Sequence, residues 1–198
     1  MVIIIMKLKP FNRTNMQSDN LNLTNKLPVT SNELIKKLDE WRIVYKHFTH
    51  EPLMTVKESK SIQEKLFGKT KGNGHIKNLY LRDKRKNNIL FVTHQDTVVN
   101  LKSLAEKIKM QRLSFGSPDR LMETLGVLPG AVSPFAMING VKKNVNLFLD
   151  INLSSFKKIF AHPLENNQTI EISIDQLENF FKKISVTPNW ISIENNNK

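Results

Sequence analysis

The run Gly74-His-Ile-Lys-Asn-Leu-Tyr-Leu-Arg-Asp83, followed closely by Ile89-Leu-Phe-Val-Thr93, is the clearest strand signal in the chain. Both runs are rich in aliphatic, aromatic and β-branched residues, and the charged residues between them predict a turn. We therefore expect two neighbouring strands over residues 76–82 and 89–93. Lys77 stands inside the first strand, where burying an ammonium group is costly unless it has a partner or a function.

Helices are expected on both sides of this strand pair along the chain. Thr30-Ser-Asn-Glu33 and Thr55-Val-Lys-Glu58 are capping boxes, in which a threonine and a glutamate side chain satisfy free backbone amides where a helix begins. The second of these helices is expected to end near Gly68. Helix-start signals and periodic apolar residues predict further helices at 101–108, 117–126 and 175–183.

The remaining strands are expected to be short. Asn139-Gly140 is a typical hairpin dipeptide and predicts a turn between strands at 135–138 and 145–149. Short apolar runs predict other strands at 43–48, 169–173 and 190–193. Because helices and strands alternate, we expect one α/β (α+β) domain over residues 31–194, with a central mixed β-sheet flanked by helices. Residues 1–30 are expected to be a flexible N-terminal extension, with an organellar presequence as the alternative.

The composition limits the classes of protein. The 198 residues include 39% hydrophobic and 24% charged side chains, which is enough for a packed core. The absence of cysteine excludes disulfides, thiolate zinc sites and thiol nucleophiles. No apolar run approaches the roughly 20 residues of a membrane-spanning helix. A soluble cytoplasmic protein is therefore expected.

Positive charge is concentrated in one part of the chain. The formal net charge is +12, and residues 57–112 carry fourteen Lys and Arg against five Asp and Glu. This segment includes a loop with glycines, Lys69-Thr-Lys-Gly-Asn-Gly74, whose backbone could approach phosphates closely. A nucleic-acid contact is one interpretation, and an ordinary solvated face is the other. The residues expected to bind nucleic acid are Lys69, Lys71, Arg82, Lys84, Arg85 and Lys86.

The sequence lacks the motifs of several enzyme classes. Its five histidines have no metal-ligand spacing, so no metal site is expected, and there is neither a Gly-x-Ser-x-Gly elbow nor a phosphate-loop signature. Three features remain candidates for chemistry: Lys77, the loop Leu125-Gly-Val-Leu-Pro-Gly-Ala-Val-Ser-Pro-Phe135, and His162-Pro-Leu164. In the loop, the amides from Gly130 to Ser133 could face a carbonyl or an oxyanion. Taken singly, each feature also has an ordinary structural explanation.

Together and in this order, these segments resemble the YbaK/prolyl-tRNA editing-domain superfamily, and within it the free-standing prolyl-tRNA deacylases of the PrdX or ProXp-ala type. The resemblance covers residues 31–193. It rests on six segments: His50-Glu-Pro-Leu-Met-Thr55, Gly74 to Asp83, Arg112-Leu-Ser-Phe-Gly-Ser117, Arg120-Leu-Met-Glu-Thr-Leu-Gly-Val127, Pro129-Gly-Ala-Val-Ser-Pro134 and His162-Pro-Leu164. The chain departs from the family pattern at Tyr80, where Phe is commoner, and at Gly116, where Ala is common.

The resemblance implies a hydrolase without metal or cofactor that cleaves the ester of a mischarged tRNA(Pro). That tRNA would be its partner, and prolyl-tRNA synthetase is a candidate second partner. The family's functional lysine corresponds to Lys77, which would stabilise the negative charge that develops as the ester is attacked. No covalent nucleophile is required, because the ester is already activated. The pocket for the aminoacyl group would be formed by Asn78, Gly130, Ala131, Val132, Ser133, His162, His50 and Thr55.

Alternatives for the substrate and the activity stay open. The resemblance favours alanine as the amino acid removed, because a small pocket that excludes proline would complete a double sieve with the synthetase. Sister branches of the superfamily edit cysteine, so cysteinyl-tRNA(Pro) is the first alternative. The second is a module of the same fold that binds tRNA or the synthetase without catalysing hydrolysis.

Overall fold

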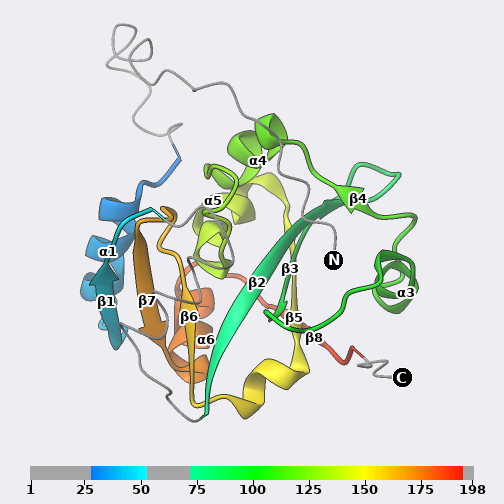
Figure 1. The fold of residues 1–198 in the computed structure, drawn as a ribbon. Coiled ribbons are helices and arrows are strands. Elements are labelled where there is room, and N and C mark those ends of the chain that lie inside the picture. Colours follow the sequence, from blue (N-terminus) through cyan, green and yellow to red (C-terminus); the bar gives the residue numbers. More distant parts are fainter. Residues whose placement is uncertain (1–27, 53–71, 194–198) are drawn as a thin grey trace, which may run out of the picture.

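Eight strands form one mixed sheet at the centre of the molecule (Figure 1). The computed structural model describes residues 28–52 and 72–193, and every structural statement below concerns these residues. Seven strands lie in the order β1-β7-β6-β2-β3-β5-β8, and β4 pairs with β2 beside this row. The predicted fold class, a single α/β (α+β) domain with a central mixed sheet, is confirmed. The strands are β1 (Tyr45–Thr49), β2 (Asn73–Arg82), β3 (Asn88–His94), β4 (Ser114–Phe115), β5 (Asn146–Asp150), β6 (Lys158–Ala161), β7 (Gln168–Ile172) and β8 (Asn189–Ile191).

The helices begin and end at the signals expected from the sequence. At the first helix, the Thr30 side chain accepts a hydrogen bond from the Glu33 amide at 3.3 Å, and the Glu33 carboxylate accepts one from the Thr30 amide at 2.7 Å. The helix α4 begins at Pro118 and is capped after Leu125 by Gly126, whose φ of +66° favours glycine. The helices are α1 (Ser31–Glu40), α3 (Leu101–Lys107), α4 (Pro118–Leu125), α5 (Met137–Gly140) and α6 (Ile174–Lys183), with short 3-10 helices η2 (Pro134–Ala136), η3 (Val141–Lys143) and η4 (Ile151–Ser155).

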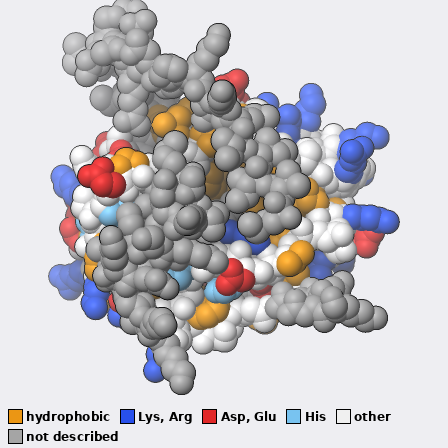
Figure 2. Space-filling model, viewed as in Figure 1, with side chains coloured by type: hydrophobic (Ala, Val, Ile, Leu, Met, Phe, Trp, Pro, Cys, Tyr) orange, Lys and Arg blue, Asp and Glu red, His pale blue; other side chains and the backbone are white. Residues whose placement is uncertain are grey.

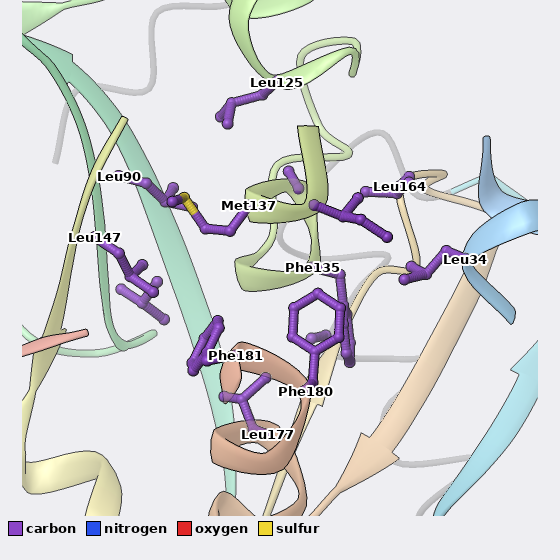
Figure 3. Packing of buried hydrophobic residues seen from close by; sticks show 14 of the residues in the cluster. Leu34, Leu90, Leu125, Phe135, Met137, Leu147, Leu164, Leu177, Phe180 and Phe181 are labelled. Atoms are coloured by element: carbon purple, nitrogen blue, oxygen red, sulfur yellow. The ribbon is translucent and has the colours of Figure 1, made fainter. Parts of the chain in front are cut away.

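Two hydrophobic cores lie on opposite faces of the sheet. The main core joins the sheet to α1, α4, α5 and α6, and in it the ring of Phe180 meets the edge of Phe135 with centroids 5.1 Å apart (Figure 3). A smaller second core joins β2, β3 and β5 to α3 on the other face, where Phe91 and Leu104 are buried. Fully burying side chains of this size stabilises the fold by about 1.5–3 kcal/mol each.

The alternation of side chains along β2 divides the candidate residues between the two faces. Tyr80 belongs to the main core and Leu81 to the second core. Successive side chains of a strand point to opposite faces, so Asn78 lies on the side of the main core and Lys77 on the other side. The same register places Lys77 directly opposite Thr93 of β3.

The hairpin predicted at Asn139-Gly140 is wrong. Residues 134–140 form η2 and α5, and β5 pairs in parallel with β3 and β8 instead of forming a hairpin with the preceding segment. The Asn139 side chain accepts a hydrogen bond from the Val29 amide at 2.7 Å and donates one to the Leu125 carbonyl at 3.0 Å. Gly140 allows close packing, because a Cβ there would lie 2.7 Å from the Leu125 side chain. The dipeptide therefore serves tertiary contacts and not a turn.

Several predictions fall outside the described residues. These are the helix expected after Thr55 and most of the extension expected over residues 1–30. The other elements correspond to the predicted ones within a few residues, except that β4, β6 and the 3-10 helices η3 and η4 were not predicted. None of the helices among residues 28–52 and 72–193 has the length and apolar character needed to cross a bilayer.

Candidate functional site

Lys77 is held by a backbone carbonyl. Its Nζ donates a hydrogen bond to the carbonyl oxygen of Thr97, in the loop that follows β3. The side chain is half-buried, and this burial lowers the pKa of Lys77, while the charge of Asp96 acts in the opposite direction. Among the described residues, no carboxylate forms a direct ion pair with this ammonium group. A cation partly withdrawn from water is therefore available to stabilise an anionic ligand or transition state.

Two histidines flank this position, and each stacks on a phenylalanine. His75 lies two residues before Lys77 and therefore on the same face, and its ring stacks on Phe160 of β6 with centroids 4.6 Å apart. Burial, together with the nearby charge of His94, lowers the pKa of His75 to about 4. His94 stacks on Phe156 with centroids 5.1 Å apart. The register pairs His94 with Ile76, so His94 lies on the opposite face of the sheet, and only the His75 ring lies on the face of Lys77.

The sheet divides next to Lys77 and Asn78, because one edge of β2 has a stretch between two partner strands where no described strand pairs with it. On one side β2 pairs with β6 only over Asn73–His75 and with β4 only over Leu81–Arg82. Between these pairings no described strand lies along that edge of β2. The Tyr80 carbonyl accepts a hydrogen bond from the Gly116 amide across this edge, so the peptide groups of Asn78, two residues earlier, point the same way.

Asn78 contributes polar atoms to this division of the sheet. Its Oδ1 is buried and has no hydrogen-bond partner among the described residues. A buried amide oxygen without a partner is unfavourable by roughly 1–3 kcal/mol, so a donor from a bound ligand would be stabilising here. This oxygen lies on the main-core face of β2, so Asn78 and Lys77 offer polar groups on opposite faces of the same strand.

The loop between α4 and η2 is fixed at both ends. Gly130 has a φ of +90°, which favours glycine. The Ser133 side chain is fully buried and accepts a hydrogen bond from the Phe135 amide at 3.2 Å. The amide of Ala131 donates to the Leu128 carbonyl at 3.0 Å, so it is not available to a ligand as the sequence suggested. Within the described part of the chain, the amides of Gly130, Val132 and Ser133 have no acceptor.

His162 is buried with one nitrogen committed. Its Nδ1 lies 2.7 Å from the Gln168 carbonyl oxygen, and because a carbonyl only accepts, Nδ1 carries a proton. Burial is the main cause that lowers the pKa of His162, with a smaller effect of His50 in the same direction. The neutral ring then leaves Nε2 as a hydrogen-bond acceptor.

His50 lies beside His162, with ring centroids 6.3 Å apart. The two residues follow β1 and β6 directly, and β7 runs between these strands. His50 Nε2 is 2.9 Å from the Thr169 hydroxyl, and His50 Nδ1 is 2.8 Å from the Glu51 carbonyl. Both nitrogens of His50 therefore have partners within the protein, and its ring supports the neighbouring ring of His162.

The structure brings some of the predicted residues together. Gly130 lies next to the turn that follows His162, since a Cβ at Gly130 would be 3.8 Å from the Asn166 side chain. The 130–134 loop, His162 and His50 thus form one group, and Lys77 with Asn78 forms another at the division of the sheet. Thr55, Lys69 and Lys71 lie outside the described residues.

The basic residues Arg82, Lys84, Arg85 and Lys86 lie at the far end of β2. The three in the turn between β2 and β3 are exposed, and the Asp83 carboxylate closes this turn by accepting from the Asn87 amide at 2.8 Å. From the rise of about 3.3 Å per residue in a strand, Lys84 is roughly 20 Å from Lys77. Figure 2 shows Lys and Arg side chains gathered at this upper right part of the face.

Sequence reasoning missed Asp96 and Thr97, which set the charge environment of Lys77. A charged residue shortly after a strand end is a weak signal that could have indicated Asp96. It also missed the buried pair in which the Thr93 hydroxyl donates to the Asp150 carboxylate at 2.5 Å. In the described part of the chain, no group of three or more His, Asp or Glu side chains is arranged to hold a metal ion.

Comparison with known proteins gives a consistent result. The family profile of the aminoacyl-tRNA editing domain matches residues 50–180. The chain is 36% identical over 150 residues to the prolyl-tRNA editing protein ProX of Acetoanaerobium sticklandii, which covers 75% of this chain and 88% of that protein. It is 30% identical over 122 residues to the prolyl-tRNA synthetase associated domain-containing protein 1 of Xenopus laevis, covering 59% of this chain and 72% of that protein.

A solved structure supports the fold. A protein provisionally identified as a trans-editing enzyme for prolyl-tRNA synthetase superposes with a TM-score of 0.62. The superposition covers 83% of this chain and 98% of that protein, at 16% identity. At this identity the likeness concerns the fold alone.

Proposed function

This chain belongs to the aminoacyl-tRNA editing domain family, whose members are hydrolases of aminoacyl-tRNA esters, and on that premise we propose that it acts in trans on mischarged tRNA(Pro). The observation that carries the proposal is Lys77, a half-buried ammonium group held by the Thr97 carbonyl beside the division of the sheet. The proposed partners are the tRNA and, from the names of the relatives, prolyl-tRNA synthetase. The proposed location is the cytoplasm.

The proposed reaction is a direct attack of water on the ester carbonyl. The new C–O bond turns the carbonyl oxygen into an oxyanion, and the charge of Lys77 stabilises it in a partly dry site. The bond to the ribose oxygen then breaks, and that oxygen leaves as a hydroxyl with a proton that originates from the water. The products are the free amino acid and the uncharged tRNA.

Other residues of the site would bind and orient the substrate. The unused amides of Gly130, Val132 and Ser133 can donate to the carbonyl or to the attacking water. Asn78 Oδ1 can accept from a donor on the substrate, which would satisfy a buried atom that lacks a partner. With Nδ1 protonated, Nε2 of His162 can accept a hydrogen bond from the amino group of the substrate. These roles assign orientation to the loop and the pocket, and charge stabilisation to Lys77.

We propose alanine as the amino acid removed. A hydrophobic synthetase pocket rejects a smaller amino acid by only about 1–3 kcal/mol, so alanine attached to tRNA(Pro) requires a second, smaller pocket for its removal. We place this second pocket at His162 and the 130–134 loop. Cysteine, similar in size, is the alternative outcome of the test.

The test compares alanyl-, cysteinyl- and prolyl-tRNA(Pro) as substrates of the full chain. We expect rapid loss of the alanyl ester, slower loss of the cysteinyl ester and no loss of the prolyl ester. A preference for the cysteinyl ester would retain the activity and change the specificity. If none of the esters is hydrolysed although the tRNA binds, the proposal is wrong and the chain is a binding module.

A further inference from the structure

An exposed aromatic ring lies on the same face of β2 as Lys77. Strand β4 places Phe115 directly opposite Leu81, and residues paired in this way share a face of the sheet. Leu81 and Lys77 lie four residues apart on one face, so Phe115 is about 13 Å along β2 from the proposed reaction centre. The Phe115 side chain is 65% exposed.

The backbone that carries this ring is fixed on both sides. Leu113, two residues earlier, is buried in the second core. The Gly116 amide donates to the Tyr80 carbonyl at 3.1 Å, and a Cβ at Gly116 would lie 2.2 Å from the Tyr80 ring. The chain therefore lies flat on Tyr80 directly after Phe115. The backbone of Phe115 is therefore already ordered before a ligand binds, which reduces the entropy cost of stacking on the ring.

Positive charge surrounds this position. The exposed side chains of Lys84, Arg85 and Lys86 lie in the turn at the end of β2, the strand with which β4 pairs. Arg112, three residues before Phe115, lines a shallow groove together with Lys102 and Glu106 of α3, where the cations outnumber the single acid. Figure 2 shows blue side chains with hydrophobic surface next to them in the region where Figure 1 places β4 and this turn. Exposed cations around an aromatic ring suit single-stranded nucleic acid, because they bind phosphates while the ring stacks on a base.

We propose that Phe115 is a stacking platform for an unpaired nucleotide in the 3′ end of the substrate tRNA. The inference rests on the proposed function, which brings the end of a tRNA to Lys77. A stacked strand rises about 3.4 Å per nucleotide, so the platform lies a few nucleotides before the ester. Phe115 is a positioning residue: it fixes the path of the single strand, and the cations at the end of β2 and at Arg112 neutralise the adjoining phosphates.

The test measures binding of RNA hairpins that carry no amino acid and copy the acceptor stem of tRNA(Pro), with and without the single-stranded 3′ tail. Stacking of one base on an aromatic ring contributes enough that its loss weakens binding by about 5- to 150-fold. We expect this loss for the tailed hairpin in both Phe115→Ala and Phe115→Leu, and little change for the blunt hairpin. Phe115→Trp retains the wild-type affinity or exceeds it. The leucine variant is the matched control, because it keeps an apolar side chain and removes the flat ring.

Three results would overturn the platform. Wild-type affinity of Phe115→Leu for the tailed hairpin would show that a flat ring is not needed. An equal loss for both hairpins would place the contact on the duplex. A change of oligomeric state in Phe115→Ala would identify a contact between copies of the chain. The hairpins carry no amino acid, so their binding is measured separately from deacylation. Loss of tail-dependent binding with deacylation intact refutes only the platform. Binding that depends on the tail, without hydrolysis of any ester, refutes only the proposed function.

Discussion

Lys77 depends on its surroundings for the pH range in which it can act. The proposed role requires the protonated ammonium group, and burial lowers the pKa of Lys77 below its ordinary value of 10.5. As the pH rises through this lowered pKa, the charge that stabilises the oxyanion is lost. The rate of deacylation, corrected for spontaneous ester hydrolysis, is therefore expected to fall at a lower pH than an ordinary lysine would give.

Asp96 influences the pH at which the rate of deacylation begins to fall, which is the alkaline limb of the pH profile. Its negative charge favours the protonated form and raises the pKa of Lys77. Replacing it in Asp96→Asn removes that effect, so the pKa decreases and the limb moves to lower pH in a profile of kcat/KM. Asp119→Asn, an exposed change at the start of α4, is the control and should leave the limb in place. A limb that stays unchanged in Asp96→Asn, or moves to higher pH, would show that Lys77 does not govern it.

The residues of the site differ in how far a sequence can predict them. Lys77 is conspicuous because a cation interrupts an apolar strand, and Asn78 follows from the resemblance. The Thr97 carbonyl contacts Lys77, and the charge of Asp96 acts on it, only because the loop after β3 folds back over β2. No local pattern specifies that path. The Ala131 amide differs, because its bond to the Leu128 carbonyl closes a four-residue β-turn, and Pro129-Gly130 is a local signal for such a turn.

At the scale of single elements, Tyr80 and Gly116 pack tightly against each other. The Tyr80 hydroxyl donates to Asn88 at 2.8 Å and accepts from Thr124 at 2.9 Å, so the ring is held in place. Gly116 lies against this ring, where a Cβ would approach its atoms to 2.2 Å and 2.4 Å. Alanine at position 116 is therefore incompatible with tyrosine at position 80 in this packing.

We expect Gly116→Ala to lower the free energy of unfolding by about 1–3 kcal/mol, the usual effect of overpacking. Urea unfolding measures this change. Ser114→Ala, an exposed substitution on the same strand, is the control and should stay within about 0.5 kcal/mol of the wild type. If Gly116→Ala were as stable as the control, the contact with Tyr80 would not constrain β4.

Elements with local signals were predicted, and elements with tertiary causes were not. The capping box at Thr30 and the Pro118 and Gly126 boundaries act within one helix, so the sequence alone reveals them. Strand β6 has four residues and is defined by its partners β2 and β7. The hairpin prediction at Asn139-Gly140 was wrong for the same reason. The Asn139 side chain bonds to a distant segment, and the absence of a side chain at Gly140 allows Leu125 to pack closely.

At the scale of the whole molecule, the fold class could be predicted from the sequence, but the order of the strands in the sheet could not. Alternating helices and strands predict a mixed sheet. The parallel pairing of β3 with β5 and of β5 with β8 depends on long-range packing in both cores. The buried hydrogen bond between Thr93 and Asp150 joins the ends of β3 and β5, and only the folded chain shows it.

The pH dependence of stability reports on the packing of His75 against β6. Burial lowers the pKa of His75 from 6.5 to about 4 in the folded protein. Below pH 6.5 the unfolded chain takes up a proton that the folded protein does not, so stability is present above that pH and is lost as the pH falls toward 4. His75→Phe keeps an aromatic ring against Phe160 and removes the titration.

We therefore expect the midpoint of urea unfolding to fall less between pH 6.5 and pH 4 in His75→Phe than in the wild type. The comparison is made within each protein across pH, so a uniform change of stability in the variant does not affect it. Identical declines in the two proteins would mean that His75 is accessible to protons in the folded state.

The most direct test of the account is the single-turnover deacylation of alanyl-tRNA(Pro) by the wild type and by Lys77→Ala. Loss of one group that stabilises an oxyanion costs on the order of 10²–10³ in rate, and we predict a decrease of that size with unchanged urea unfolding. Lys36→Ala, which removes an exposed lysine of α1, should retain the wild-type rate. Wild-type turnover by Lys77→Ala would contradict the assignment of the chemistry to this lysine.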